Sequence, residues 1–294
     1  PVLMREGIDY ASKEVAKYNL DKSHKVETSN DIESVATISS GDKEIGQYIA
    51  QAMEKVGRDG VISVDESNSF DTELEVAEGM QYDKGYVSPY MVSDREKMTV
   101  DLDNPLIMVT DQKINTVQEI LPILEQVMQS NKPLLLIADD FEQEVISTLV
   151  VNKLRGTFNV VATKAPGFGD NQKEILQDIA ILTNAKFYSK DLNMNLKDMQ
   201  MTDLGSAKKI HITKDHTTMI GGSGDKTAID QRVKEITEQM NNSKSDYDKK
   251  NYAERLGKLS NGVAIIKVGG ATESELKEKK LRIEDALNAT KAAV

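Results

Sequence analysis

The sequence lacks cysteine and tryptophan, and aromatic residues make up only 5% of its 294 positions. Without cysteine, disulfide bonds and thiolate metal sites are excluded. Because aromatics are few, we expect a core of isoleucine, leucine, valine and methionine. Apolar residues are 39% of the chain, which is enough for one large domain or two smaller ones.

Long apolar runs are also missing, and none approaches the roughly 20 residues that span a bilayer. The formal charge is −11, with 48 acidic and 37 basic residues, so phosphate backbones would be repelled. We therefore expect no membrane and no nucleic-acid partner. The lack of cysteine and of a signal peptide fits a cytoplasmic protein. The chain starts without Met and stops in a helical pattern, so we expect a piece of a longer protein.

The middle of the chain alternates strand and helix patterns, which predicts an α/β layer with a buried sheet flanked by helices. The run Leu134–Ala138 is apolar throughout, which is typical of a buried parallel strand. The expected strands are 106–110, 134–138, 158–165 and 186–189, and the expected helices are 116–129, 141–154 and 172–183. Because Pro122 lies within the first of these helices, a first-turn kink or a later start is possible.

The flanking segments predict a smaller α+β part. The expected helices there are 7–20, 42–56 and one starting at Thr272, the strands are 35–39, 61–64 and 263–268, and 21–30 is a linker. Between these parts, 208–212 and 217–220 predict a hairpin. The ranges 227–240 and 246–259 predict two charged helices in an antiparallel pair.

Two helices, 116–129 and 141–154, carry apolar residues over an unusually wide arc. Such a helix is either fully buried or presents apolar side chains to a partner. The pattern alone favours burial and leaves an exposed binding strip as the alternative.

Other candidate sites are weaker. The glycine clusters 166–169 and 221–224 do not continue into Gly-Lys-Ser or Gly-Lys-Thr, so tight turns before helices are the better interpretation. The three histidines, without cysteine or a close partner histidine, predict no metal site. By pattern alone, Asp285 lies on a solvated helix face, where Arg282, three residues earlier, is its candidate ion-pair partner.

Several long stretches resemble the group I chaperonins, the GroEL family, and the similarity runs essentially from end to end. They are Glu78–Tyr90, Lys132–Ala138, Thr148–Asn152, Lys164–Asp170, Ser245–Asp248, Lys277–Lys280 and Ile283–Leu287. The resemblance implies an equatorial tail at 1–20, an intermediate domain at 21–77 and 263–294, and an apical polypeptide-binding domain at 78–262. It places hinges at Gly79 and Gly262, where glycine crosses φ/ψ space at low steric cost.

The same resemblance implies a chaperone that captures non-native polypeptides and a GroES-type co-chaperonin on an apical groove. The residues that carry over are Tyr86, Tyr90, Met91, Leu121, Leu124, Ile146, Val150, Val151 and Asn152. We expect the groove residues to be exposed, so that Leu124→Ser and Val151→Ser leave the melting temperature nearly unchanged. Leu135 and Ile137 are expected in the core.

The resemblance further implies an ATP-driven homo-oligomeric double ring that uses ATP and Mg²⁺ when intact, with Asp285 as the catalytic carboxylate. Lys84 and Glu273 match an inter-subunit pair, although Lys84 stands where arginine is common and cannot form a bidentate fork. Met91 replaces an aromatic, and Asn261 replaces a glycine. The phosphate-binding Gly-Asp-Gly-Thr-Thr segment is not in this chain, so we expect no ATP cofactor and no ATPase activity here.

Two other classes of protein would leave different features. An enzyme on an α/β scaffold would need a polar catalytic cluster inside a pocket, and the sequence predicts none. A passive structural module would bury both apolar helices completely.

Overall fold

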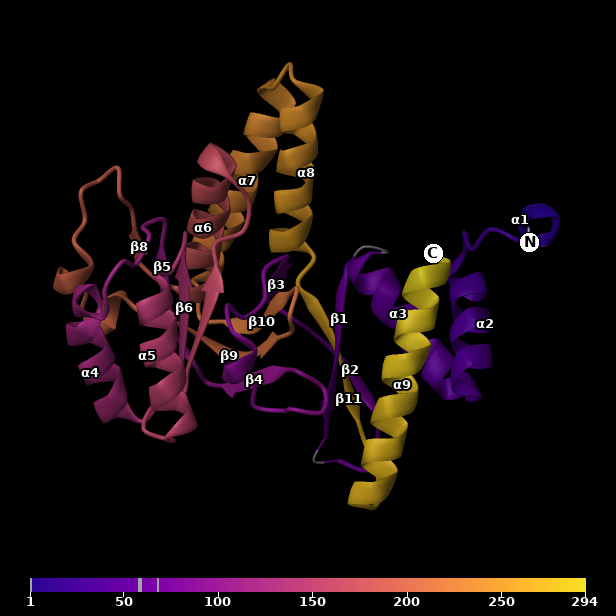
Figure 1. Ribbon diagram of the computed structural model, residues 1–294, viewed down its shortest axis with the longest axis horizontal. Helices are drawn as coiled ribbons and strands as arrows, with labels where there is room; N and C mark the ends of the chain where they lie inside the picture. Colours follow the sequence, from indigo (N-terminus) through magenta and orange to yellow (C-terminus); the bar gives the residue numbers. More distant parts are fainter. Residues whose placement is uncertain (1, 58–59, 68) are drawn as a thin grey trace. The chain divides into compact units, whose positions relative to one another are not determined.

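The computed structural model describes residues 2–57, 60–67 and 69–294. It divides into two compact units (Figure 1). The smaller unit comprises Pro1–Glu54, Val64–Thr72 and Val268–Val294, and the larger unit comprises Lys55–Ser63 and Glu73–Lys267. The architecture is mixed α/β, as the strand–helix alternation predicted. The finer division into three domains stays a prediction.

The larger unit is built around an eight-stranded mixed sheet of order β3-β10-β9-β5-β6-β7, with β4 on β9 and β8 on β5. Its strands are β3 (Gly79–Tyr82), β4 (Val100–Asp103), β5 (Leu106–Thr110), β6 (Leu134–Ala138), β7 (Val160–Lys164), β8 (Phe187–Tyr188), β9 (Gly205–Ile212) and β10 (Thr217–Gly222). β5, β6 and β7 run parallel, and β6 is buried at every residue, which confirms the prediction for this strand. β9 and β10 form the predicted antiparallel hairpin.

Helices follow the parallel strands as the alternation predicted. They are α4 (Leu121–Ser130) after η2 (Val117–Glu119), α5 (Gln143–Leu154) and α6 (Gly169–Thr183). The larger unit also contains α7 (Lys226–Asn242), which follows β10, α8 (Asp246–Ser260) and the short turns η1 (Pro89–Met91), η3 (Leu196–Asp198) and η4 (Met201–Asp203). α4 starts after the expected position because Pro122 occupies its first turn. The first glycine cluster forms a turn that leads into α6, with φ of +77° at Gly167, and Gly169 is the first residue of that helix. The turn expected at 221–224 is wrong for Gly221 and Gly222, because both belong to the end of β10, where Gly221 has φ +65°.

A second sheet has three strands in the order β1-β11-β2, formed by β1 (Val61–Glu66), β11 (Val263–Val268) and β2 (Glu73–Ala77). β11 is almost wholly buried, as its apolar sequence predicted. Gly262 precedes it with φ +66°, and a Cβ there would lie 2.5 Å from the Ala77 carbonyl oxygen. At Gly79 a Cβ would lie 2.3 Å from the Met219 oxygen. Both positions therefore require glycine, and their role as hinges stays a prediction.

The smaller unit is helical, with α1 (Val2–Lys22), α2 (Ser29–Ser40), α3 (Lys43–Val56) and α9 (Glu273–Ala293). The strand expected at 35–39 is wrong, because these residues lie in α2. Thr28 and Asp31 form a capping box that starts this helix. Ile32, Ala36 and Ser40 then fall on one buried face, and α2 packs against α9. Burial of this face outweighs the β-branched character of the short run.

Among the described residues, no helix combines the length and the apolar character that crossing a bilayer requires. α1 has no buried residue.

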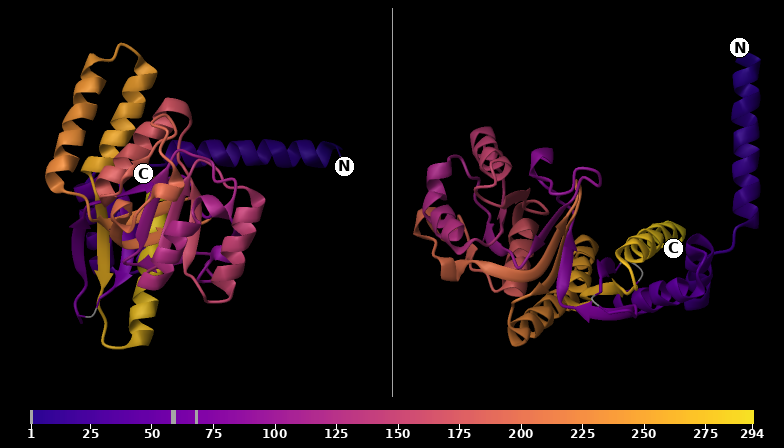
Figure 2. Two further views of the ribbon diagram at one scale, coloured as in Figure 1. Left: turned by 90° about the vertical axis from the view of Figure 1, so that its left-hand side faces the viewer. Right: turned by 90° about the horizontal axis from the view of Figure 1, so that it is seen from below.

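A buried ion cluster fixes α7 and α8 against α6 within the larger unit. Figure 2 shows α7 and α8 as the adjacent antiparallel pair that the sequence predicted. Asp178 of α6 is buried and accepts hydrogen bonds from the Nε atoms of Arg232 and Arg255, both at 2.7 Å. Glu174, one turn away, accepts from the same two guanidinium groups at 2.7 and 3.0 Å. Three helices thus share one network of charge-assisted bonds.

Asp178→Asn should lower the free energy of unfolding by about 3–5 kcal/mol, because two buried guanidinium groups lose their charged partner. Urea unfolding of the 294-residue chain, followed by circular dichroism, measures this loss. Glu174→Gln is the matched control, and its more exposed carboxylate should cost about 0–1 kcal/mol. Equal losses for the two variants would contradict the assignment of Asp178 as the centre of the cluster.

Candidate functional site

The two apolar helices singled out in the sequence lie on one face of the large sheet. α4 connects β5 to β6 and α5 connects β6 to β7, and right-handed crossovers between parallel neighbours bring successive helices to the same side. Figure 1 shows α4 and α5 as neighbours. The loops before them are tied together, since the Ile114 amide donates to the Asp140 oxygen at 2.9 Å and the Glu142 amide to the Ile114 oxygen at 3.0 Å.

α4 divides its apolar residues between the core and the surface. Ile123, Leu124 and Val127 are buried against the sheet. Leu121 and Met128, seven residues apart on one helical face, are each 41% exposed. The expected exposure of Leu124 is wrong, because its side chain is only 6% exposed and belongs to the core. Leu124 lies three residues after Leu121, on the edge of the helix that turns toward the sheet.

α5 divides in the same way. Val145 and Leu149 are buried, and Ile146 and Val150 are half-buried against the core. Val151 is 43% exposed and Leu154 57% exposed. Asn152 is half-buried and its side-chain amide donates to the Thr148 oxygen at 2.9 Å.

The short turn η1 packs against α5 and adds aromatic side chains. Tyr90 is 67% exposed, and Tyr86 is half-buried against the core. Met91 is fully buried, so its expected exposure in the groove is wrong. The Ser88 hydroxyl accepts a hydrogen bond from the Tyr90 amide at 3.4 Å, and Pro89 occupies the first turn. This turn directs Met91 into the core and leaves Tyr90 at the surface.

The apolar strip is defined here as the exposed residues of these three elements: Tyr90, Leu121, Met128, Val151 and Leu154. Sequence reasoning assigned three of them and missed Met128 and Leu154. The signal was present, because Met128 follows Leu121 by seven residues and Leu154 follows Val150 by four. Four other predicted residues are half-buried and lie on α5 or shortly before η1: Ile146, Val150, Asn152 and Tyr86.

Charged groups border the loops before α4 and α5. Lys113 pairs with Glu142 at 2.5 Å, and this hydrogen bond raises the pKa of the Lys113 ammonium. Lys164 pairs with Asp140 at 2.7 Å and lowers the pKa of that carboxyl. At the end of α5, burial lowers the pKa of Lys153 to about 8, and its ammonium donates to the Asn159 side-chain oxygen at 2.9 Å. The strip is apolar, and these charges lie beside it.

The other predicted residues lie elsewhere. Asp285 is exposed on α9, opposite the buried stripe of Ile283, Ala286 and Leu287. Its carboxylate has no ion-pair or hydrogen-bond partner in the described chain, and Arg282 pairs with Glu278 instead. This overturns the expected pairing with Arg282.

Lys84 and Glu273 belong to different units, and each has a partner in its own unit. The Lys84 ammonium lies 5.5 Å from the centre of the Phe168 ring, a cation–π distance. Glu273 pairs with Lys277 at 2.6 Å, which lowers the pKa of the Glu273 carboxyl. Their inter-subunit pairing stays a prediction.

Metal-binding clusters of three or more acidic or histidine side chains are absent from the described residues. Two of the three histidines pair separately, His211 with Asp101 at 2.9 Å and His216 with Asp83 at 3.1 Å.

The sheet supports a pair of helices that expose an apolar strip, and exposed apolar surface of this kind is typical of interaction sites. The family model of TCP-1/cpn60 chaperonins matches residues 1–294, so the chain belongs to the TCP-1/cpn60 chaperonin family. This is a family of molecular chaperones in protein folding.

Three similar proteins bear the name chaperonin GroEL. They are 69% identical in Acholeplasma laidlawii (strain PG-8A), 63% in Aster yellows witches'-broom phytoplasma (strain AYWB) and 62% in Onion yellows phytoplasma (strain OY-M). Each match covers 100% of this chain and 55% of the relative, so the chain spans about half the length of these proteins. The predicted resemblance to the group I chaperonins is confirmed.

Leu124→Ala should cost about 2–5 kcal/mol of stability, because it opens a cavity under α4. Leu121→Ala on the same helix should cost less than about 0.5 kcal/mol, since much of that side chain is already in water. Chemical denaturation of both variants measures the difference. Equal costs would contradict the division of α4 into a core face and a surface face.

Proposed function

We propose that this chain captures non-native polypeptides on the apolar strip. The single observation that carries the proposal is the exposure of five large apolar side chains over α4, α5 and η1, on elements held by a buried sheet. Contact with a client stabilises the complex by about 25 cal/mol for each Å² of apolar surface that it removes from water. A contact that needs only apolarity, without a fixed hydrogen-bond pattern, accepts many sequences.

The alternatives fit less well. A passive structural module would bury both helices, yet Leu154 and Val151 are about half exposed. An enzyme would need convergent polar groups, and the charged groups near the strip are paired with one another. The strip favours binding over catalysis at this site.

We further propose, from the family resemblance, that the longer protein is a cytoplasmic ATP-driven chaperone in a double ring. The strip would then take a GroES-type co-chaperonin after the client, and Tyr86, Ile146, Val150 and Asn152 would border the contact. Leu124 and Met91 would support it from beneath, since both are buried. Lys84 and Glu273 would contribute at most about 0–1 kcal/mol between subunits, because exposed ion pairs are weak.

We propose that this chain does not by itself make a nucleotide site, because 166–168 lead directly into α6 and Gly221 and Gly222 belong to β10. Asp285 supplies one unpartnered carboxylate on a helix anchored by its opposite face. By resemblance, we propose that this carboxylate orients the attacking water when ATP and Mg²⁺ are bound to the longer protein.

Val151→Ser and Leu154→Ser should each weaken binding of a reduced, unfolded client protein by about fivefold or more, because each removes a partly exposed apolar anchor. Fluorescence polarisation of the labelled client measures the dissociation constant. Ile38→Ser is the matched control, since Ile38 is strongly exposed in the smaller unit and outside the strip. The proposal fails if Ile38→Ser weakens binding as much as Leu154→Ser does.

In the longer protein, Asp285→Ala should slow ATP hydrolysis by about 10²–10⁴-fold, the range for loss of a group that positions or transfers a proton. ATP binding should persist, because the substitution removes no phosphate-binding group. Steady-state turnover and calorimetric binding give the two values. Asn288→Ala, at another exposed position of α9, serves as the control. Unchanged turnover in Asp285→Ala would remove this residue from the reaction.

A further inference from the structure

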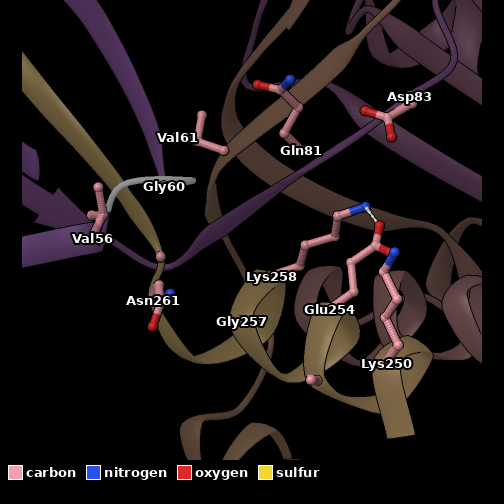
Figure 3. Close-up of a pocket in the computed structure, with 13 residues that line it drawn as sticks. Val56, Gly60, Val61, Gln81, Asp83, Lys250, Glu254, Gly257, Lys258 and Asn261 are labelled. Atoms are coloured by element: carbon pink, nitrogen blue, oxygen red, sulfur yellow. Dashed lines mark hydrogen bonds and ion pairs between the residues drawn. The ribbon is translucent and has the colours of Figure 1, made fainter. Parts of the chain in front are cut away.

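A cavity of about 550 Å³ lies within the larger unit, beside α8 (Figure 3). Val61 and Ala253 provide apolar walls, and Gly57 and Gly60 contribute backbone to the lining. Its residues come from the end of α3, the start of β1, β3 and the exposed flank of α8. The space is large enough for a small organic molecule.

Gly257 of α8 keeps this space open. A Cβ at this position would meet only the Asn261 side-chain nitrogen, at 3.8 Å, so neither sterics nor a positive φ requires glycine here. Glycine is also a poor helix former. Local folding therefore does not explain this residue, and its effect on the structure is to leave one wall of the cavity without a side chain.

The charged side chains that line the cavity differ in whether they have an ion-pair or hydrogen-bond partner. Figure 3 shows Lys258 bonded to Glu254, at 2.8 Å. Asp83 is engaged by His216 at 3.1 Å. Lys250, one helical turn before Glu254, has neither an ion-pair nor a hydrogen-bond partner among residues 2–57, 60–67 and 69–294. Among the described residues, the cavity thus combines an apolar wall with one cation, the exposed Lys250, that has no partner.

We propose that this cavity binds small aromatic carboxylates, with the ring in the space beside Gly257 and Val61 and the carboxylate on the Lys250 ammonium. A charge-assisted hydrogen bond to Lys250 fixes the orientation, and burial of the ring supplies most of the affinity. Glu254 and Asp83 oppose an anion less than free carboxylates would, because each already has a cationic or hydrogen-bonding partner. The proposal does not depend on client capture by the apolar strip.

The test uses 6-fluoro-2-naphthoate and its neutral carboxamide as probes, followed by fluorine NMR with the 294-residue chain. The naphthoate should bind with a dissociation constant of about 0.1–1 mM, as expected for a ligand of this size. The carboxamide should bind about tenfold more weakly. Lys250→Gln should weaken naphthoate binding by about tenfold and leave the carboxamide unaffected. Lys249→Gln, next in sequence and outside the cavity, should change neither.

Gly257→Leu should fill the cavity and abolish binding of both probes while α8 stays helical by circular dichroism. If that variant does not fold, the Lys250→Gln comparison decides alone. Leu154→Ser tests whether the probes sit on the apolar strip, and it should leave both affinities unchanged. The proposal is overturned if both probes bind the unmodified chain equally, or if Lys250→Gln leaves naphthoate binding intact. It is also overturned if a folded Gly257→Leu variant still binds, or if no binding is seen up to about 10 mM.

Discussion

The burial of three adjacent parallel strands is the constraint on which the rest of the larger unit depends. β5, β6 and β7 bury nearly all their side chains, so each connection must return along a helix that covers the sheet. α4 and α5 each cover the sheet with one stripe of buried apolar residues, which includes Ile123 in α4 and Leu149 in α5. Their apolar arcs are wider than the sheet can cover. The remainder forms the apolar strip, held in place by the same packing that keeps the core dry.

The alternation of strands and helices could be predicted from the sequence because, in long elements, the spacing of apolar residues and the length of the segment indicate the same structure. Leu134–Ala138 and the two charged helices, now α7 and α8, show this agreement. The segment 35–39 could not be predicted, since a short β-branched run is ambiguous until its packing is known. Thr28, seven residues earlier, starts the helix, and contact of α2 with α9 stabilises it. Local sequence gave no sign of that distant partner.

The candidate site was predictable at the level of the helix and less so at the level of the side chain. Leu121 and Leu124 are only about 60° apart around the helix axis, yet the sheet edge passes between them. No spacing argument could decide which of the two faces water. Met91 was misplaced for a similar reason, because a single turn at Ser88 and Pro89 decides whether it or Tyr90 points inward. The cavity beside α8 was invisible in the sequence, since it depends on a side chain that Gly257 does not have.

We propose that non-native polypeptide contacts a folded α4–α5 surface and not a locally unfolded segment. Amide hydrogen exchange of the 294-residue chain, with and without an unfolded client, tests it directly. We expect client-dependent protection confined to residues 86–92, 117–130 and 143–155, with α7 and α8 unchanged. Protection spread evenly over the chain, or centred on α7 and α8, would contradict it.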